Sequence, residues 1–195
     1  VLLERAIAIL GEGQVLGEWF NQIPVASGLV DHRADGRAAI DLMRLDGDRV
    51  EFVELKWGSD TPAFAAFEIL LYGLAFLYCY INRVDLGYEN TSLMKVKEVS
   101  LQVLAPLVYF GGYNFTWLGL GLDAGIRNLT QTISNGELSM DFGFTSFPSD
   151  FNLPFGTGQE VRQFCDPKNG EGIQAIVSAI QNIKPIWPSK KAENP

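Results

Sequence analysis

The apolar positions along the chain recur at two spacings, which predict an alternation of helices and strands. Residues 2–10 carry apolar side chains at helical spacing and are followed by two nearby glycines, so a short first helix is expected. Thr61 and Pro62 precede a long apolar run toward Asn82, and this pair is typical of a helix start. The same patterns predict a short helical piece at 17–22, strands at 38–45, 49–57, 99–110 and 137–146, and helices at 116–134 and 171–183. The expected fold class is therefore α/β, in a single domain over residues 1–195.

The most specific local pattern is a β-hairpin formed by the first two predicted strands. Asp46-Gly47 lies between them, and Asp-Gly is a preferred pair in two-residue hairpin turns. A turn centred on these two residues pairs Leu45 with Asp48 and fixes which side chains share a face. If the turn held three residues instead, every side chain of one strand would move to the other face.

Three ionisable residues share one face of this hairpin in the two-residue register. They are Asp41, Glu54 and Lys56, with Glu54 the diagonal neighbour of Asp41. Apolar residues occupy both faces, as expected of strands that are covered on both sides. Two carboxylates on a covered face of the hairpin need partners. A divalent cation, which prefers oxygen ligands, would be one such partner, and Lys56 would offset the remaining charge. The alternative is a partly exposed edge hairpin in which Glu54 and Lys56 form a weak surface ion pair.

The composition predicts one sizeable core and gives no sign of a basic surface. Of the 195 residues, 47% are hydrophobic, which is enough for the core of one domain. A chain of this length is too short for two ordinary domains. The formal net charge is −8, whereas a nucleic-acid-binding protein is expected to carry a basic stripe. Cys79 and Cys165 lie far apart and offer neither a zinc site nor a disulfide framework, so a cytoplasmic location is expected. His32, the only histidine, is expected to have a surface or structural role.

Two stretches, 63–81 and 99–122, are apolar enough to raise the question of a membrane helix. The first contains Glu68, and the second is interrupted by Pro106, two glycines and Asn114. Buried elements of a globular core show the same composition, so no membrane is expected among the partners.

The ionisable residues of the hairpin resemble the signature of a nuclease superfamily. Asp41, then Glu54-Leu55-Lys56 on the next strand, then a buried helix, is similar to the PD-(D/E)xK, or restriction-endonuclease-like, superfamily. Glu68 and Tyr72 lie one helical turn apart, where RecB-like members carry a Gln-x-x-x-Tyr motif. Glu4 lies in the first helix, where many members have a glutamate near the metal.

The resemblance covers residues 1–110 and implies a core of helix, three-stranded β-meander, helix and strand, with 111–195 as a C-terminal α/β extension packed on that core. Two positions depart from the family pattern: Ile40 stands where the motif has proline, and Glu68 replaces glutamine. The helical residues also have structural alternatives. Glu68 is then a helix residue that reaches solvent or pairs with Arg or Lys, Tyr72 packs in the core, and Glu4 is an exposed acid of a first helical turn.

The resemblance implies hydrolysis of phosphodiester bonds with Mg²⁺ or Mn²⁺ as cofactor and nucleic acid, expected to be DNA, as substrate. Asp41, Glu54 and the backbone carbonyl of Leu55 would bind the metal, and Glu68 and Glu4 are further candidate ligands. Lys56 would position the attacking water and stabilise developing charge, and Tyr72 would contact the substrate. Such folds occur in DNA repair, recombination and defence. The alternative is a catalytically inactive acidic module on the same fold, which binds a protein partner or a second copy through its apolar C-terminal half.

Overall fold

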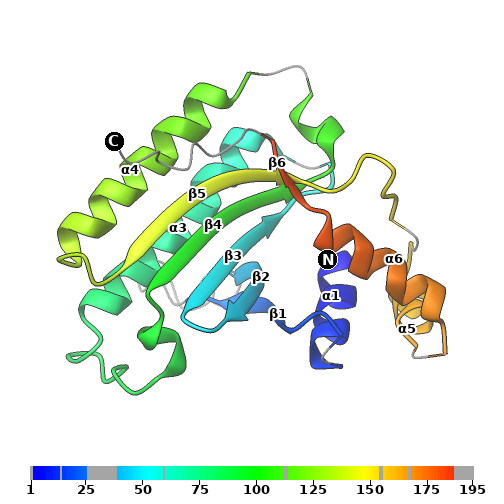
Figure 1. Ribbon diagram of the computed structural model, residues 1–195, viewed down its shortest axis with the longest axis horizontal. Coiled ribbons are helices and arrows are strands. Elements are labelled where there is room, and N and C mark those ends of the chain that lie inside the picture. Colours follow the sequence, from blue (N-terminus) through cyan, green and yellow to red (C-terminus); the bar gives the residue numbers. More distant parts are fainter. Residues whose placement is uncertain are drawn as a thin grey trace.

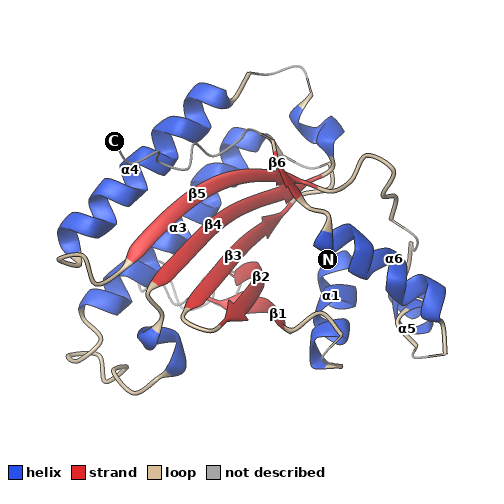
Figure 2. Cartoon of the chain, in the orientation of Figure 1, coloured by secondary structure: helices blue, strands red, loops and turns tan. Residues whose placement is uncertain are grey.

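The computed structural model describes residues 2–13, 15–25, 39–58, 60–111, 114–153, 156–166 and 168–186. Over these residues the chain forms a six-stranded mixed sheet with helices on both faces, which confirms the predicted α/β class (Figures 1 and 2). His32 lies outside the described residues, and its role stays a prediction.

Helices and strands are interspersed along the chain. In order they are α1 (Leu2–Glu12), β1 (Glu18–Pro24), β2 (Ala39–Asp46), β3 (Arg49–Leu55), α3 (Pro62–Ile81), β4 (Glu98–Ala105), α4 (Thr116–Ile133), β5 (Ser139–Ser146), α5 (Gly158–Phe164), α6 (Gly170–Gln181) and β6 (Lys184–Pro185). Two short 3-10 helices, η1 (Ser92–Lys95) and η2 (Leu107–Phe110), flank β4.

The strands lie in the sheet in the same order as in the sequence, from β1 to β6. β1, β2 and β3 form an antiparallel meander, β4 and β5 are parallel to β3, and β6 is antiparallel to β5. A parallel neighbour requires a crossover connection, and α3 supplies it between β3 and β4. Because β3 and β4 are parallel, their carboxyl ends meet at one edge of the sheet, close to the start of α3.

Two hydrophobic cores lie on opposite faces of the sheet, so both sides of the hairpin are covered as predicted. The larger core joins Phe52 of β3 to Ile69 of α3 and Ile126 of α4. The smaller core joins the other face to Ile7 of α1 and Ile176 of α6. In Figure 1, α3 passes behind the sheet, while α1, α5 and α6 gather at its right-hand side. Neither β2 nor β3 is an edge strand, which rules out the exposed-hairpin alternative.

Several elements differ from their prediction. The segment predicted as a short helix at 17–22 belongs to β1, since its side chains alternate between the core and solvent beside β2. The strand predicted at 99–110 ends at Ala105, because Pro106 has no N–H to donate to a ladder and η2 follows it. The helix α5 was not predicted; it is short and begins with a capping box at Thr157 and Glu160.

The hairpin turn lies one residue later than predicted. Asp46 pairs with Arg49, so the two turn residues are Gly47 and Asp48. Gly47 has a φ of 64°, a left-handed conformation that favours glycine at the first turn position. The shift moves the register by an even number of residues, which preserves the faces. Leu42 pairs with Val53, so the next residues along the two strands, Asp41 and Glu54, lie directly opposite each other. The prediction had placed them diagonally.

Candidate active site

The predicted ionisable residues meet at the carboxyl end of β3. Glu4, Glu54 and Lys56 are buried, with 3%, 3% and 9% of their surface exposed. They are the only buried Asp, Glu, Lys or Arg residues in the described part of the chain. Since isolated charges are almost never fully buried without partners, this concentration marks the place as a site built for charge. The reading of Glu4 as an exposed acid of the first helical turn is therefore wrong.

Lys56 links β3 to α3 through two close ion pairs. Its Nζ atom lies 2.8 Å from Oε1 of Glu54 and 3.0 Å from Oε2 of Glu68. A third carboxylate, Asp60, lies 3.6 Å away. The backbone N–H of Lys56 donates to the carbonyl of Leu104, which anchors the segment after β3 to β4. Three acidic side chains from a strand, a loop and a helix thus share one ammonium group.

Asp41 is oriented by the backbone of β3. Its Oδ2 atom accepts a hydrogen bond of 2.9 Å from the N–H of Leu55, the residue whose carbonyl is a predicted metal ligand. This hydrogen bond joins β2 to β3 beside Glu54. Asp41 and Glu54, the two predicted metal ligands, therefore lie opposite each other on neighbouring strands.

Gln22 and Asp60 are two site residues that sequence reasoning missed. Gln22 donates a 2.8 Å hydrogen bond to Oε2 of Glu4 and lies in β1 beside Asp41, between the pairs that Asn21 and Ile23 make with β2. Gln22 and Asp60 have φ values of 53° and 62°, which side-chain-bearing residues rarely adopt. Residues held in such conformations cluster at functional sites, because the surroundings must impose them. A backbone outlier has no signature in the sequence, so neither residue could be found there.

The acids of the site hold their protons more tightly than usual. Burial raises the pKa of Glu54 to about 8, and the charge of Asp41 adds to this effect against the pull of Lys56. Burial also raises the pKa of Asp41, opposed by the hydrogen bond from Leu55 and reinforced by Glu4. Burial alone would lower the pKa of Lys56, but its bonds to Glu54 and Glu68 outweigh that and raise it. Lys56 is therefore a permanent cation at neutral pH.

The stability of the folded chain should fall with rising pH because of Glu54. The pKa of its carboxyl is about 8 in the folded chain and near 4.5 in a model peptide, so stability present below pH 4.5 is lost as the pH rises through 8. In the presence of a chelator, we expect the free energy of unfolding of Glu54→Gln to be about 2 kcal/mol higher than that of the parent at pH 9. Near pH 5 this difference should disappear. Urea unfolding at both pH values measures it.

The control for this comparison is Glu51→Gln, which changes the same strand on its other face. We expect its difference from the parent to change little over the same pH range. A Glu54→Gln advantage that does not grow between pH 5 and pH 9 would contradict the raised pKa.

The donor set suits a hard cation, although the side chains are not arranged around one. Across the described residues no three His, Cys, Asp or Glu side chains form a group that could hold a metal ion. Lys56 instead lies between Glu54 and Glu68. Two observations nevertheless fit a divalent cation. The Oε2 atom of Glu54 is buried without a hydrogen-bond partner, and the charge of a neighbouring acid adds to the raised pKa of Glu54 and of Asp41. Carboxylate oxygens are the ligands that Mg²⁺ and Mn²⁺ prefer.

Two tyrosines lie close enough to these charges for their pKa values to change. Tyr72 of α3 is 8% exposed and belongs to the larger core; burial, then Glu68 and Glu54, raises its pKa to about 12. Tyr109 of η2 also has a raised pKa, through burial and nearby acids that include Asp60, and its hydroxyl is buried without a hydrogen-bond partner. Tyr109 was not predicted, because the parallel pairing of β4 with β3 brings η2 to the site from far along the chain.

Trp57 extends the site with an aromatic surface. It follows Lys56 directly and is 40% exposed, and its ring lies 5.8 Å from that of Phe147 and 6.0 Å from that of Phe151. These contacts hold a large flat side chain beside the buried charges. Such a surface could stack against a base or another planar group.

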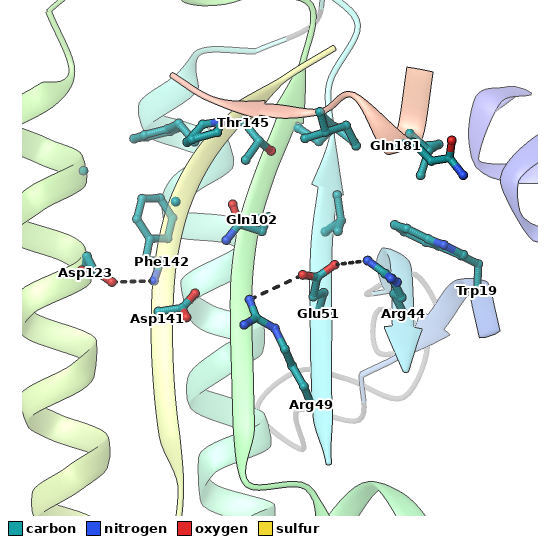
Figure 3. Close-up of a pocket in the computed structure, with 18 of the residues that line it drawn as sticks. Trp19, Arg44, Arg49, Glu51, Gln102, Asp123, Asp141, Phe142, Thr145 and Gln181 are labelled. Atoms are coloured by element: carbon teal, nitrogen blue, oxygen red, sulfur yellow. Dashed lines mark hydrogen bonds and ion pairs between the residues drawn. The ribbon is translucent and has the colours of Figure 1, made fainter. Parts of the chain in front are cut away.

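A cavity of about 820 Å³ lies on the face of the sheet opposite α3, away from the predicted residues (Figure 3). Its charged side chains largely neutralise one another. Glu51 lies 3.6 Å from Arg44 and 3.5 Å from Arg49, while Arg127 lies 2.9 Å from Asp123. Figure 3 shows the two arginines reaching toward Glu51 from either side. Because the paired charges leave no clear excess of one sign, the buried acidic cluster is the better candidate for chemistry.

No family model, no curated protein and no solved structure matches this chain.

Proposed function

We propose that this chain is a metal-dependent phosphodiesterase of the nuclease type, acting on nucleic acid. One observation carries the proposal: the only buried acids and bases among the described residues, Glu4, Glu54 and Lys56, lie beside Asp41 in one cluster. Burying ionisable groups lowers the stability of a fold, so the presence of this cluster points to a functional requirement.

The order of elements supports the same proposal. The described chain runs from a helix through an antiparallel meander of three strands to a second helix and then to a strand parallel to the third. This is the order that the resemblance to PD-(D/E)xK nucleases implies. It places the Asp on the second strand and the Glu-x-Lys segment at the end of the third.

The chain's own residues would divide the work as follows. Asp41, Glu54 and the carbonyl of Leu55 would hold Mg²⁺ or Mn²⁺, with Glu68 and Glu4 as further candidates. When bound, the cation supplies a Lewis acid that polarises the phosphate and lowers the pKa of a water. Lys56, held by Glu68, would donate hydrogen bonds to the attacking water and to the phosphate oxygens. Its raised pKa keeps it protonated, so it acts as a cation and not as a general base.

Cleavage assays test the proposal directly. We expect the protein to cut single- or double-stranded DNA or RNA in Mg²⁺ or Mn²⁺, and to lose at least about 100-fold of that rate in Asp41→Asn. The matched control is Asp141→Asn, which removes a carboxylate from the cavity on the opposite face of the sheet and should leave the rate unchanged. Failure to cut any of these substrates, or equal loss in both variants, would argue against the proposal.

A catalytically inactive interaction module is the second candidate. The arrangement of Lys56 between Glu54 and Glu68, without a ready metal group among the described side chains, favours it. This alternative predicts that no substrate is cut and that divalent cations leave the stability of the protein unchanged.

A further inference from the structure

The face of α3 that points away from the sheet carries a row of large apolar side chains. Each is between 37% and 64% exposed, and we call the row the apolar stripe: Phe64, Phe67, Leu71, Leu74, Tyr78 and Ile81. The other face of α3 already packs in the larger core through residues such as Ile69 and Phe76. There the absence of a side chain at Gly73 allows Leu101 of β4 to approach closely. The residues of the apolar stripe therefore take no part in the core of the chain.

The residues of the apolar stripe are separated alternately by three and four positions. This spacing places all six on one side of the helix and has the 3.5-residue period with which two helices pack along each other. A row of charged residues is the usual finding on the outer face of a surface helix. Here Glu68 is the only charged residue in the 20 residues of α3, and it points toward Lys56 in the site.

The exposed area of the stripe matches one side of a dimer interface. Scaled by side-chain surfaces of about 150–250 Å², the exposed fractions leave roughly 600 Å² of apolar surface per chain. That is at the upper limit of the largest patch on a typical monomer, about 300–600 Å². Two such stripes would together bury about 1,200 Å², which is the lower bound of a stable interface.

We propose that the apolar stripe is the interface with a second copy of this chain, formed by two α3 helices packed antiparallel about a two-fold axis. The alternating spacing reads the same in both directions, so a self-complementary contact follows from it. With the axis midway along the stripe, Leu71 lies opposite the partner's Leu74. Further out, Phe67 lies opposite the partner's Tyr78, and Phe64 opposite the partner's Ile81. The proposal stands independently of the proposed nuclease function.

A membrane surface fits the stripe less well. α3 is long and apolar enough to cross a membrane by length and composition, but 44% of the relevant window is buried inside the protein. An interfacial helix that binds lipid usually has Lys and Arg beside its apolar face. α3 has no basic residue in its last turn. Arg83, which follows the helix, is paired with Glu137, and Asp85 and Glu89 come after it. Together with the net charge of −8, these acids would repel the anionic lipids of a membrane.

A charge-swap experiment tests both the interface and its register. Sedimentation equilibrium should give twice the chain mass of 21.5 kDa for the parent protein. Phe67→Lys and Tyr78→Glu, each alone, should weaken the dimer by at least about 100-fold, because each places two charges in the apolar contact. Mixed together, the two variants should form a heterodimer, in which the introduced lysine faces the introduced glutamate of the other chain.

The exposed position of both residues keeps the test independent of folding, and unchanged circular dichroism and melting temperature verify this. Leu129→Lys, on an exposed apolar position of α4, is the control and should remain dimeric. A monomeric parent at high micromolar concentration overturns the proposal. So does a dimer that survives both single substitutions, or a mixture that stays monomeric. Binding of the parent to phosphatidylcholine–phosphatidylglycerol vesicles, lost in both variants, would assign the stripe to a membrane surface instead.

Discussion

Lys56→Met is expected to cost the folded chain about 3 kcal/mol at pH 8 and to reduce cleavage at least about 100-fold. The substitution keeps the length and the apolar stem of the side chain but removes the charge that Glu54 and Glu68 share. Only 10% of the Lys56 side chain is exposed, so water cannot replace the lost partner. Urea unfolding measures the first effect, and the rate of DNA or RNA cleavage in Mg²⁺ measures the second.

The two readouts separate structure from function. Lys95→Met, an exposed position in η1, is the control and should change neither quantity. The loss of stability in Lys56→Met should shrink toward pH 5, because the protonated carboxyl group of Glu54 no longer needs a cation. A stable variant without cleavage would still support the nuclease proposal, whereas an unstable variant that cleaves at the parent rate would remove Lys56 from the mechanism.

Local signals in the sequence were sufficient for the elements that depend on neighbouring residues. Thr61 and Pro62 predicted the start of α3, and the structure shows the Thr61 hydroxyl accepting a hydrogen bond from the N–H of Phe64. The hairpin could likewise be predicted from its Asp-Gly pair and its apolar pattern. Its turn was placed one residue early because the dipeptide alone does not say whether glycine is the first or the second turn residue.

Long-range contacts account for what the sequence could not show. The strand conformation of β1 depends on pairing with β2, which lies more than ten residues away. Tyr109 reaches the site only because α3 returns the chain so that β4 lies parallel to β3. In contrast, Asp41, Glu54 and Lys56 lie on two strands joined by a tight turn, so their shared face follows from alternation alone.

The same helix connects the two proposals of function and assembly. α3 presents Glu68 and Tyr72 toward the buried charges, and its exposed side carries the apolar stripe. A helix that is apolar around its circumference is expected to be buried on all sides. In this chain the sheet covers one side, and a second copy would cover the other.

Mg²⁺ is expected to stabilise the folded chain at pH 8 through Asp41 and Glu54. At ten to one hundred times its dissociation constant, a ligand bound only by the folded state adds about 1.4–2.7 kcal/mol to the free energy of unfolding, which for this length raises the melting temperature by roughly 5 °C.

Asp41→Ala and Glu54→Ala should each abolish the shift, whatever their own stability, because each removes a predicted ligand of the same ion. Asp141→Ala is the control, since its carboxylate lies in the cavity on the other face and should leave the shift intact. Thermal unfolding in a Mg²⁺ titration measures these shifts, and the same rise in both ligand variants as in the parent would show that the cation binds elsewhere. Burial raises the pKa values of both acids and leaves the Oε2 atom of Glu54 without a hydrogen-bond partner. A cation bound to both carboxylates favours their charged forms, so Mg²⁺ should also weaken the fall of stability with pH.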